Sequence, residues 1–148
     1  MTSPVSYADV VPGTELPAVT YPVTRLSLVK YCGASGDFNV IHWNERIAKS
    51  VGLPDVIAHG MFTMAEAVRV VTDWCGDPGM LVDYQVRFVK PVVVPDGLDE
   101  ESGARLVVTA KIGAISEDGI ARIDLTAMSA GEKVLGMARA SVRLSVDG

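Results

Sequence analysis

The sequence contains few histidines and cysteines, two residue types that often act in catalysis and metal binding. It has two histidines, His42 and His59, and two cysteines, Cys32 and Cys75. The cysteines are far apart and form no CxxC pattern, so neither a zinc site nor a disulfide framework is indicated, and reduced thiols are expected. Any acid–base chemistry near neutral pH that uses an imidazole must therefore use one of the two histidines.

The sequence also lacks long apolar runs and an excess of basic residues. No stretch approaches the length needed to span a bilayer, and the N-terminus has neither the cationic start nor the apolar run of a signal peptide. The formal net charge is −5, which argues against binding to nucleic acid or to anionic membrane surfaces. We therefore expect a cytoplasmic protein, in which a local cluster of arginines could still receive an anionic thioester carrier.

Apolar residues are what the chain has in quantity. Of its 148 residues, 49% are hydrophobic and 21% are charged. This balance allows a sizeable core and argues against disorder. The length fits one domain over residues 1–148.

Helices are predicted in the first half of the chain. Before them, residues 1–23 predict an extended arm with one short strand. Thr24 can cap a helix over residues 25–32, and Asn44 can cap a short helix that ends near Gly52. Both caps satisfy backbone N–H groups that a helix start leaves without partners.

A longer helix is predicted from Gly60 to Trp74. Apolar residues recur there at spacings of three and four, and they cover much of the circumference. Such a helix is buried on more than one side. The predicted apolar face consists of Met61, Met64, Ala65, Val68, Val71 and Thr72, and Ala67 and Val70 widen it.

The rest of the chain is typical of strands. We predict them over residues 81–94, 105–116, 121–129 and 134–146, with a hairpin turn between the second and third. Helices followed by a meander of antiparallel strands indicate an α+β fold, in which the sheet wraps the long helix. Edge strands of this length are normally paired or covered, so we expect a dimer whose strands continue across the interface.

Asp37 and His42 form the candidate site. They lie five residues apart, a spacing that a helix would turn about 140° apart and a strand would point to opposite faces. Gly36 and Asn39 favour turns instead. We therefore expect a loop that aims the carboxylate and the imidazole at one point, which suits proton transfer on a small molecule or a water.

A place for negative charge is predicted at the start of the long helix. His59 and Gly60 begin that helix, where backbone N–H groups lack partners and the helix dipole is positive. Because glycine has no Cβ, a carbonyl oxygen can approach the Gly60 N–H, which would stabilise a thioester enolate. The matching reaction is loss or addition of water across C2 and C3 of an acyl thioester. Which of Asp37 and His42 takes the C2 proton is left open.

The motifs around these residues resemble one family. Residues 35–42, SGDFNVIH, are similar to the hydratase 2 motif of MaoC-type (R)-specific enoyl hydratases and (3R)-hydroxyacyl dehydratases. IAHGM at 57–61 and VRFVKPV at 86–92 resemble that family's helix start and following strand, and the similarity extends over essentially the whole chain. IHW at 41–43 and WCGDPG at 74–79 narrow the resemblance to the B-subunit type of (3R)-hydroxyacyl-carrier-protein dehydratase found in mycolic-acid-type elongation.

The resemblance implies a single hot-dog fold, in which a curved antiparallel sheet wraps the helix that starts at His59. It implies Asp37 and His42 as the catalytic pair, Gly60 as the oxyanion donor, and Asn39 as a brace for the loop. We group His59 with Gly60 as an oxyanion or substrate-binding residue, although a histidine at a helix start is as often a capping or packing residue. The resemblance implies no metal or redox cofactor.

The same resemblance implies the substrates and partners. The substrate would be an acyl-CoA or an acyl-carrier-protein thioester, within fatty acid elongation. The protein would work as a homodimer or as a heterodimer with a related, non-catalytic hot-dog subunit that houses the acyl chain. One position departs from the family: Val40 stands where a proline is usual, which predicts a softer loop.

Two other functions are weighed against hydration. The chain could be a non-catalytic acyl-binding subunit of a heterodimeric dehydratase, although such a subunit would have no reason to keep Asp37 and His42. It could also be a hot-dog acyl-CoA thioesterase, with Glu66 on the long helix directing a water. That interpretation leaves the Asp37 and His42 pair without a purpose. Cys32 is interpreted as a small buried residue, not as a nucleophile.

Overall fold

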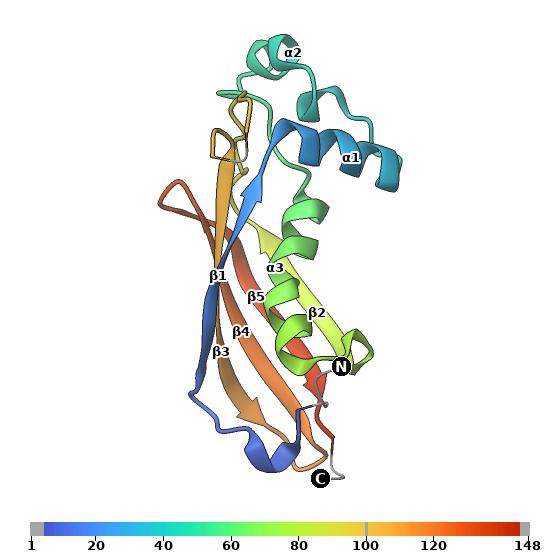
Figure 1. The fold of residues 1–148 in the computed structure, drawn as a ribbon, viewed down its shortest axis with the longest axis vertical. Coiled ribbons are helices and arrows are strands. Elements are labelled where there is room, and N and C mark those ends of the chain that lie inside the picture. Colours follow the sequence, from blue (N-terminus) through green and yellow to red (C-terminus); the bar gives the residue numbers. More distant parts are fainter. Residues whose placement is uncertain (1–4, 100, 146–148) are drawn as a thin grey trace.

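A computed structural model describes residues 5–99 and 101–145 of the chain. One long helix, α3 (Gly60–Cys75), lies along one face of a curved five-stranded sheet (Figure 1). Two shorter helices, α1 (Arg25–Ser35) and α2 (Glu45–Ser50), lie beyond one end of that sheet. The first residues of the predicted arm and the predicted end of the last strand at Val146 lie outside the described residues. No helix of the described part is long and apolar enough to cross a membrane.

The sheet is antiparallel throughout and has the strand order β1-β3-β4-β5-β2. Strands β3, β4 and β5 form the predicted meander, whereas β2 pairs with β5 at the far edge. The described residues also form the short 3-10 turns η1, η2 and η3. The bounds are β1 (Glu15–Val23), β2 (Leu81–Phe88), β3 (Ala104–Ile115), β4 (Ile120–Ser129), β5 (Glu132–Arg143), η1 (Tyr7–Asp9), η2 (Val40–His42) and η3 (Pro78–Met80).

The prediction of one strand over residues 81–94 was too long. The β2 strand ends at Phe88, and the chain beyond it makes one isolated bridge, between Ile57 and Val93. Two features accompany the early end: the N–H groups of Val89 and Lys90 both donate to the one carbonyl of Val134, and Pro91 donates no hydrogen bond to a neighbouring strand. The freed segment lies beside the residues that lead into α3, where Ala58 N–H donates to the carbonyl of Val92 at 2.9 Å.

Both predicted helix caps are present. The Thr24 hydroxyl accepts from the Ser27 N–H at 3.1 Å, and the Asn44 side chain accepts from the Ile47 N–H at 3.1 Å. Helix α1 runs three residues past its predicted end. It stops at Gly36, whose φ of 75° is left-handed and therefore suits glycine. That residue directs the chain into the candidate site.

Helix α3 packs on the sheet through only part of the predicted apolar face. Met61 is 58% exposed and Ala65 is also exposed, whereas Val71 of the predicted face is buried. The helix has a second apolar side, which the described residues cover incompletely, because the sheet contacts the helix from one direction (Figure 1). The buried residues of the helix are Thr63, Ala67, Val70, Val71 and Cys75.

Arg25 holds together the segments that surround the start of α3. Its Nε donates to the carbonyl of Val94 at 2.7 Å, and its Nη2 donates to carboxylates of Asp55 at 2.6 Å and Glu45 at 3.3 Å. Charge-assisted bonds of this kind are stronger than neutral ones, above all when they are partly shielded from water. The contacts connect α1, α2 and the segment before α3, and so support the loop between them.

Candidate active site

The loop after α1 is built from short side-chain-to-backbone bonds. The Ser35 hydroxyl accepts from the Asp37 N–H at 3.1 Å, the Asp37 carboxylate accepts from the Asn39 N–H at 3.1 Å, and the Asn39 side chain accepts from the Ile41 N–H at 3.3 Å. Ser, Asp and Asn favour such turns, because their short side chains reach backbone groups two residues away. Asn39 also caps the 3-10 turn η2, which carries His42.

The structure brings Asp37, His42 and His59 together. A carboxylate oxygen of Asp37 and one ring nitrogen of each histidine all lie within 4.8 Å of one another. The two imidazole rings are stacked, with centroids 3.7 Å apart and planes inclined by 23°. His42 and His59 are buried, whereas Asp37 is exposed. A carboxylate and an imidazole therefore converge on one point, as the loop interpretation required.

The orientation of His42 is fixed by one backbone carbonyl. Its Nδ1 lies 2.7 Å from the Ile57 carbonyl oxygen. A carbonyl accepts only, so Nδ1 carries the proton and Nε2 keeps its lone pair. Burial lowers the pKa of His42 below its ordinary 6.5, and the nearby His59 lowers it further. The Ile57 carbonyl and the Asp37 carboxylate act in the opposite direction without reversing the shift. His42 is therefore mainly neutral at pH 7.

Gly60 begins α3 with its backbone amide available. None of the described residues accepts a loop or cap hydrogen bond from its N–H, and the preceding His59 makes no side-chain cap. The ring of Phe88 lies against Gly60, since a Cβ at position 60 would be 3.2 to 3.3 Å from three of its carbons. The first N–H of a helix without a partner is a donor for an anionic oxygen.

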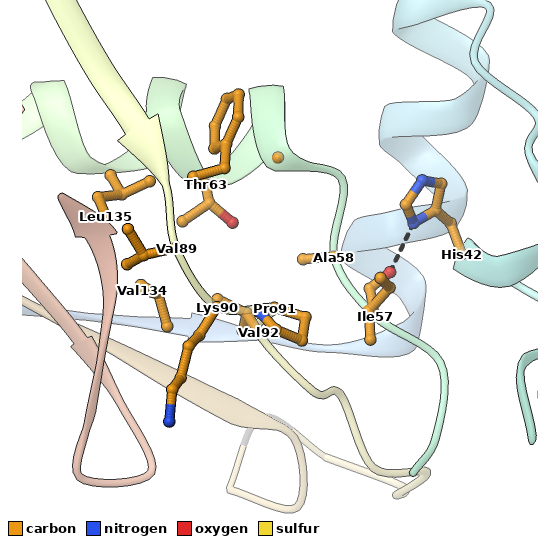
Figure 2. Close-up of a pocket in the computed structure, with 12 residues that line it drawn as sticks. His42, Ile57, Ala58, Thr63, Val89, Lys90, Pro91, Val92, Val134 and Leu135 are labelled. Atoms are coloured by element: carbon orange, nitrogen blue, oxygen red, sulfur yellow. Dashed lines mark hydrogen bonds between the residues drawn. The ribbon is translucent and has the colours of Figure 1, made fainter. Parts of the chain in front are cut away.

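A cavity of about 360 Å³ connects His42 with Gly60. Figure 2 shows His42 at one end and Val134 and Leu135 at the other. The lining is mostly apolar, and this volume lies within the range of small-molecule sites. The side chain of Lys90 extends away from the other residues in Figure 2 and pairs with Glu132 at 2.7 Å. Asp37, Asn39 and His59 are not among the residues that line the cavity.

Glu66 and Cys32 lie elsewhere. Glu66 pairs with Arg69 at 2.8 Å and borders a separate hollow beside Tyr31 and Phe62. Cys32 is buried, and burial together with the charge of Asp37 raises the pKa of its thiol. A thiol with a raised pKa is a poor nucleophile near neutral pH. Neither residue lines the cavity that contains His42 and Gly60.

Asp37, His42 and His59 are also of the residue types that bind metal ions. A ligating imidazole points the lone pair of its nitrogen at the ion, which therefore lies near the plane of the ring. The rings of His42 and His59 are stacked and inclined by only 23°, so their planes meet too far from the rings for one ion to bind a nitrogen of each in plane. The arrangement fits proton transfer better than metal binding.

Sequence reasoning missed several residues of the site. Thr63 lines the cavity and donates its hydroxyl to the His59 carbonyl at 3.3 Å. Phe88 covers one side of Gly60, and Ile57 orients His42 through its backbone. Thr63, three residues after Gly60 on one helix, could have been found from its spacing. The other two contacts depend on how the chain folds back and have no local signal.

Replacing Val40 by proline is expected to stabilise the loop. Val40 is the first residue of η2, and none of the described residues accepts a loop or cap bond from its N–H. The preceding Asn39 has φ −53° and ψ 126°, which a residue before proline readily adopts. We expect Val40→Pro to raise the free energy of unfolding by about 0.4–1 kcal/mol, because proline restricts the unfolded chain. Chemical denaturation measures this, and a lower stability would show that the backbone at position 40 does not suit proline.

The chain was compared with protein-family models, with curated proteins and with solved structures. The MaoC like domain model matches residues 8–115. A 3-hydroxyacyl-thioester dehydratase X from Mycobacterium tuberculosis is 42% identical over 79 residues, which are 53% of this chain and 27% of that protein. A solved MaoC-like dehydratase has a TM-score of 0.89 and 40% identity, over 97% of this chain and 44% of its own. The chain thus spans less than half the length of these two relatives.

A more distant structure supports the fold alone. The unliganded R-hydratase PhaJ1 from Pseudomonas aeruginosa has a TM-score of 0.80 and 22% identity, over 95% of this chain and 86% of its own. The likeness covers both the sheet and the long helix. The predicted α+β hot-dog fold is therefore confirmed.

Proposed function

Because the chain belongs to the MaoC-like domain family, we propose that it adds water to trans-2-enoyl thioesters and removes it from (3R)-hydroxyacyl thioesters. The main support for this proposal is that the Asp37 carboxylate and the His42 imidazole lie close together. His42 and Gly60 both line the adjacent cavity. The curated relative that is 42% identical is named 3-hydroxyacyl-thioester dehydratase X, which agrees with this chemistry. The reaction class is therefore that of a hydro-lyase.

In the hydration direction, a water held between Asp37 and His42 attacks C3 of the enoyl group. The new bond from oxygen to C3 moves the electrons of the double bond toward the thioester carbonyl. One member of the pair takes a proton from the water, and the pair returns one proton to C2. The product carries the hydroxyl on C3 and the hydrogen on C2, and dehydration follows the same steps in reverse.

The enolate that forms on this path needs a donor at its oxygen. The Gly60 N–H fills this role in our proposal, because its position at the start of α3 adds the positive end of the helix dipole. Asn39 supports the loop through its cap on η2. The apolar cavity would receive the acyl group.

We propose a dimer as the working form. Strand β2 is the sheet edge nearest the site, and its outer side is unpaired among the described residues. Val82 and Phe88 on this strand and Met61 on α3 are each about half exposed. Solved relatives include the ChsH1-ChsH2 and HadBC complexes from Mycobacterium tuberculosis. Pairing along β2, with a second copy or a related hot-dog subunit, would cover both the strand edge and this apolar surface.

The test is hydration of trans-2-enoyl-CoA by the purified chain. We expect loss of the enoyl absorbance and a product of (3R) configuration, with the mass of the active species showing a dimer. Activity that appears only after a second subunit is added would instead favour the acyl-binding alternative. Acyl-carrier-protein thioesters, assayed in parallel, distinguish the two carriers and bear on the proposed place in fatty acid elongation.

The thioesterase alternative has its own measurement. That chemistry would need a carboxylate that directs water into the cavity, but Glu66 pairs with Arg69 and borders a different hollow. We expect no release of free CoA from saturated acyl-CoA. Release that Glu66→Gln abolishes would replace the hydratase proposal.

A further inference from the structure

His59 is more deeply enclosed than a substrate contact requires. Only 2% of its surface is exposed, and it does not line the cavity that holds His42 and Gly60. It precedes α3 but makes no side-chain cap to that helix. Burying a polar ring is costly unless its contacts repay that cost. The contacts of His59 therefore indicate its function.

The first of these contacts holds the main chain at Asp37. The Nε2 of His59 lies 3.0 Å from the Asp37 carbonyl oxygen. A carbonyl only accepts, so Nε2 carries the proton and donates it. The side-chain bonds made by Ser35, Asp37 and Asn39 within the loop each reach only two residues away. Among the described residues, the His59 bond is thus the side-chain hydrogen bond that fastens the Asp37 end of the loop to the start of α3.

The second contact holds the ring of His42. The stacked arrangement of the two imidazoles, at 3.7 Å, prevents the His42 ring from tilting toward His59. The Ile57 carbonyl fixes rotation within the ring plane, because it accepts from Nδ1 at 2.7 Å. Helix α1 supports His59 from behind: the Tyr31 ring packs edge-on at 4.7 Å, and the Cys32 sulfur lies 3.6 Å from Nε2.

We propose that His59 is a positioning residue: it holds Asp37 and His42 in reacting geometry through one hydrogen bond and one ring stack, and it does not touch the substrate. This inference rests on the proposed hydratase function. It replaces the expectation that His59 binds substrate. Small displacements of a catalytic group are enough to lower turnover strongly, so a residue of this kind acts on kcat.

Three substitutions separate the hydrogen bond from packing. In His59→Gln, the side-chain amide can reach the position of Nε2 and donate to the Asp37 carbonyl. His59→Asn is also an amide but is one methylene shorter, so it cannot donate there. His59→Leu keeps apolar bulk and has no donor. Kinetics with trans-2-enoyl-CoA, at substrate concentrations that define KM and kcat separately, are compared with the wild type.

We expect kcat to fall about 10- to 100-fold in His59→Leu and His59→Asn, with KM little changed. We expect His59→Gln to recover a large part of that loss. Should His59→Leu fail to fold, the comparison of His59→Gln with His59→Asn still tests the hydrogen bond. Both side chains end in an amide, and they differ by one methylene in length. Equal rates for the two amides, wild-type kcat in His59→Leu, or a rise confined to KM would each overturn the positioning function. Absence of hydration by the wild type would instead show that the proposed function itself is wrong, and full activity in both Asp37→Asn and His42→Gln would show that the proposed pair is not the one that His59 positions.

Discussion

His42→Gln and Asp37→Asn are each expected to lower kcat for hydration by about 10²–10⁴-fold, the usual effect of removing a positioned acid or base. Glutamine and asparagine keep much of the shape and can still form hydrogen bonds, but neither transfers protons near neutral pH. The Asp37 side chain also accepts from the Asn39 N–H, and an asparagine oxygen can preserve that bond. The loss would therefore report on chemistry more than on loop structure.

Asp73→Asn is the matched control. Asp73 is exposed on α3, in the half of the helix away from Gly60. Its replacement changes the net charge by the same amount as Asp37→Asn. We expect wild-type kcat and KM for this variant. Full activity in either site variant would remove Asp37 or His42 from the mechanism.

The dependence of activity on pH provides an independent check. Burial first, and then His59, lower the pKa of His42 below 6.5. If neutral His42 is required, kcat/KM of the wild type should rise with pH through this lowered pKa and already be level at pH 7. Acid should therefore inhibit below pH 6.5 and not above it. The profile should be measured over at least two pH units on the acid side, within the range of stable fold. A midpoint above 6.5 would contradict the lowered pKa of His42.

The elements that could be predicted from the sequence are those with local signals. Thr24 and Asn44 cap their helices because their side chains reach the backbone a few residues ahead. The loop from Gly36 to His42 could be predicted for the same reason, since its turn bonds connect residues two apart. That Asp37 and His42 lie close together could thus be predicted from the sequence alone.

Features that depend on distant contacts were not accessible. Strand β2 pairs with β5, which is distant in sequence. The residue pattern within β2 does not indicate which strand it pairs with. The buried side of α3 was predicted only in part, because apolar residues surround much of the helix and periodicity could not show which of them meet the sheet. His59 looked like a helix-start residue, and its bond to Asp37 crosses 22 residues of sequence.

Gly60→Pro should lower kcat by about 10²–10³-fold relative to Gly60→Ala, if the Gly60 N–H stabilises the enolate. Proline removes that N–H, whereas alanine keeps it. Position 60 is the first residue of α3, where proline is well tolerated. The preceding His59 already has φ −58° and ψ 137°, which a residue before proline adopts. The exchange thus removes the donor with little demand on the helix.

Alanine is the right reference because both variants add a Cβ. That atom would lie 3.2 to 3.3 Å from the Phe88 ring, so both variants meet this contact, and proline adds two ring carbons on the side of the nitrogen that loses its hydrogen. Should the added carbon alone stop turnover, Phe88→Leu in both backgrounds relieves the contact and the comparison is repeated. Equal kcat in the proline and alanine variants would show that another group holds the enolate oxygen. A selective loss in the proline variant would assign this function to the backbone N–H of Gly60. That N–H is available to the enolate oxygen because none of the described residues accepts a loop or cap hydrogen bond from it.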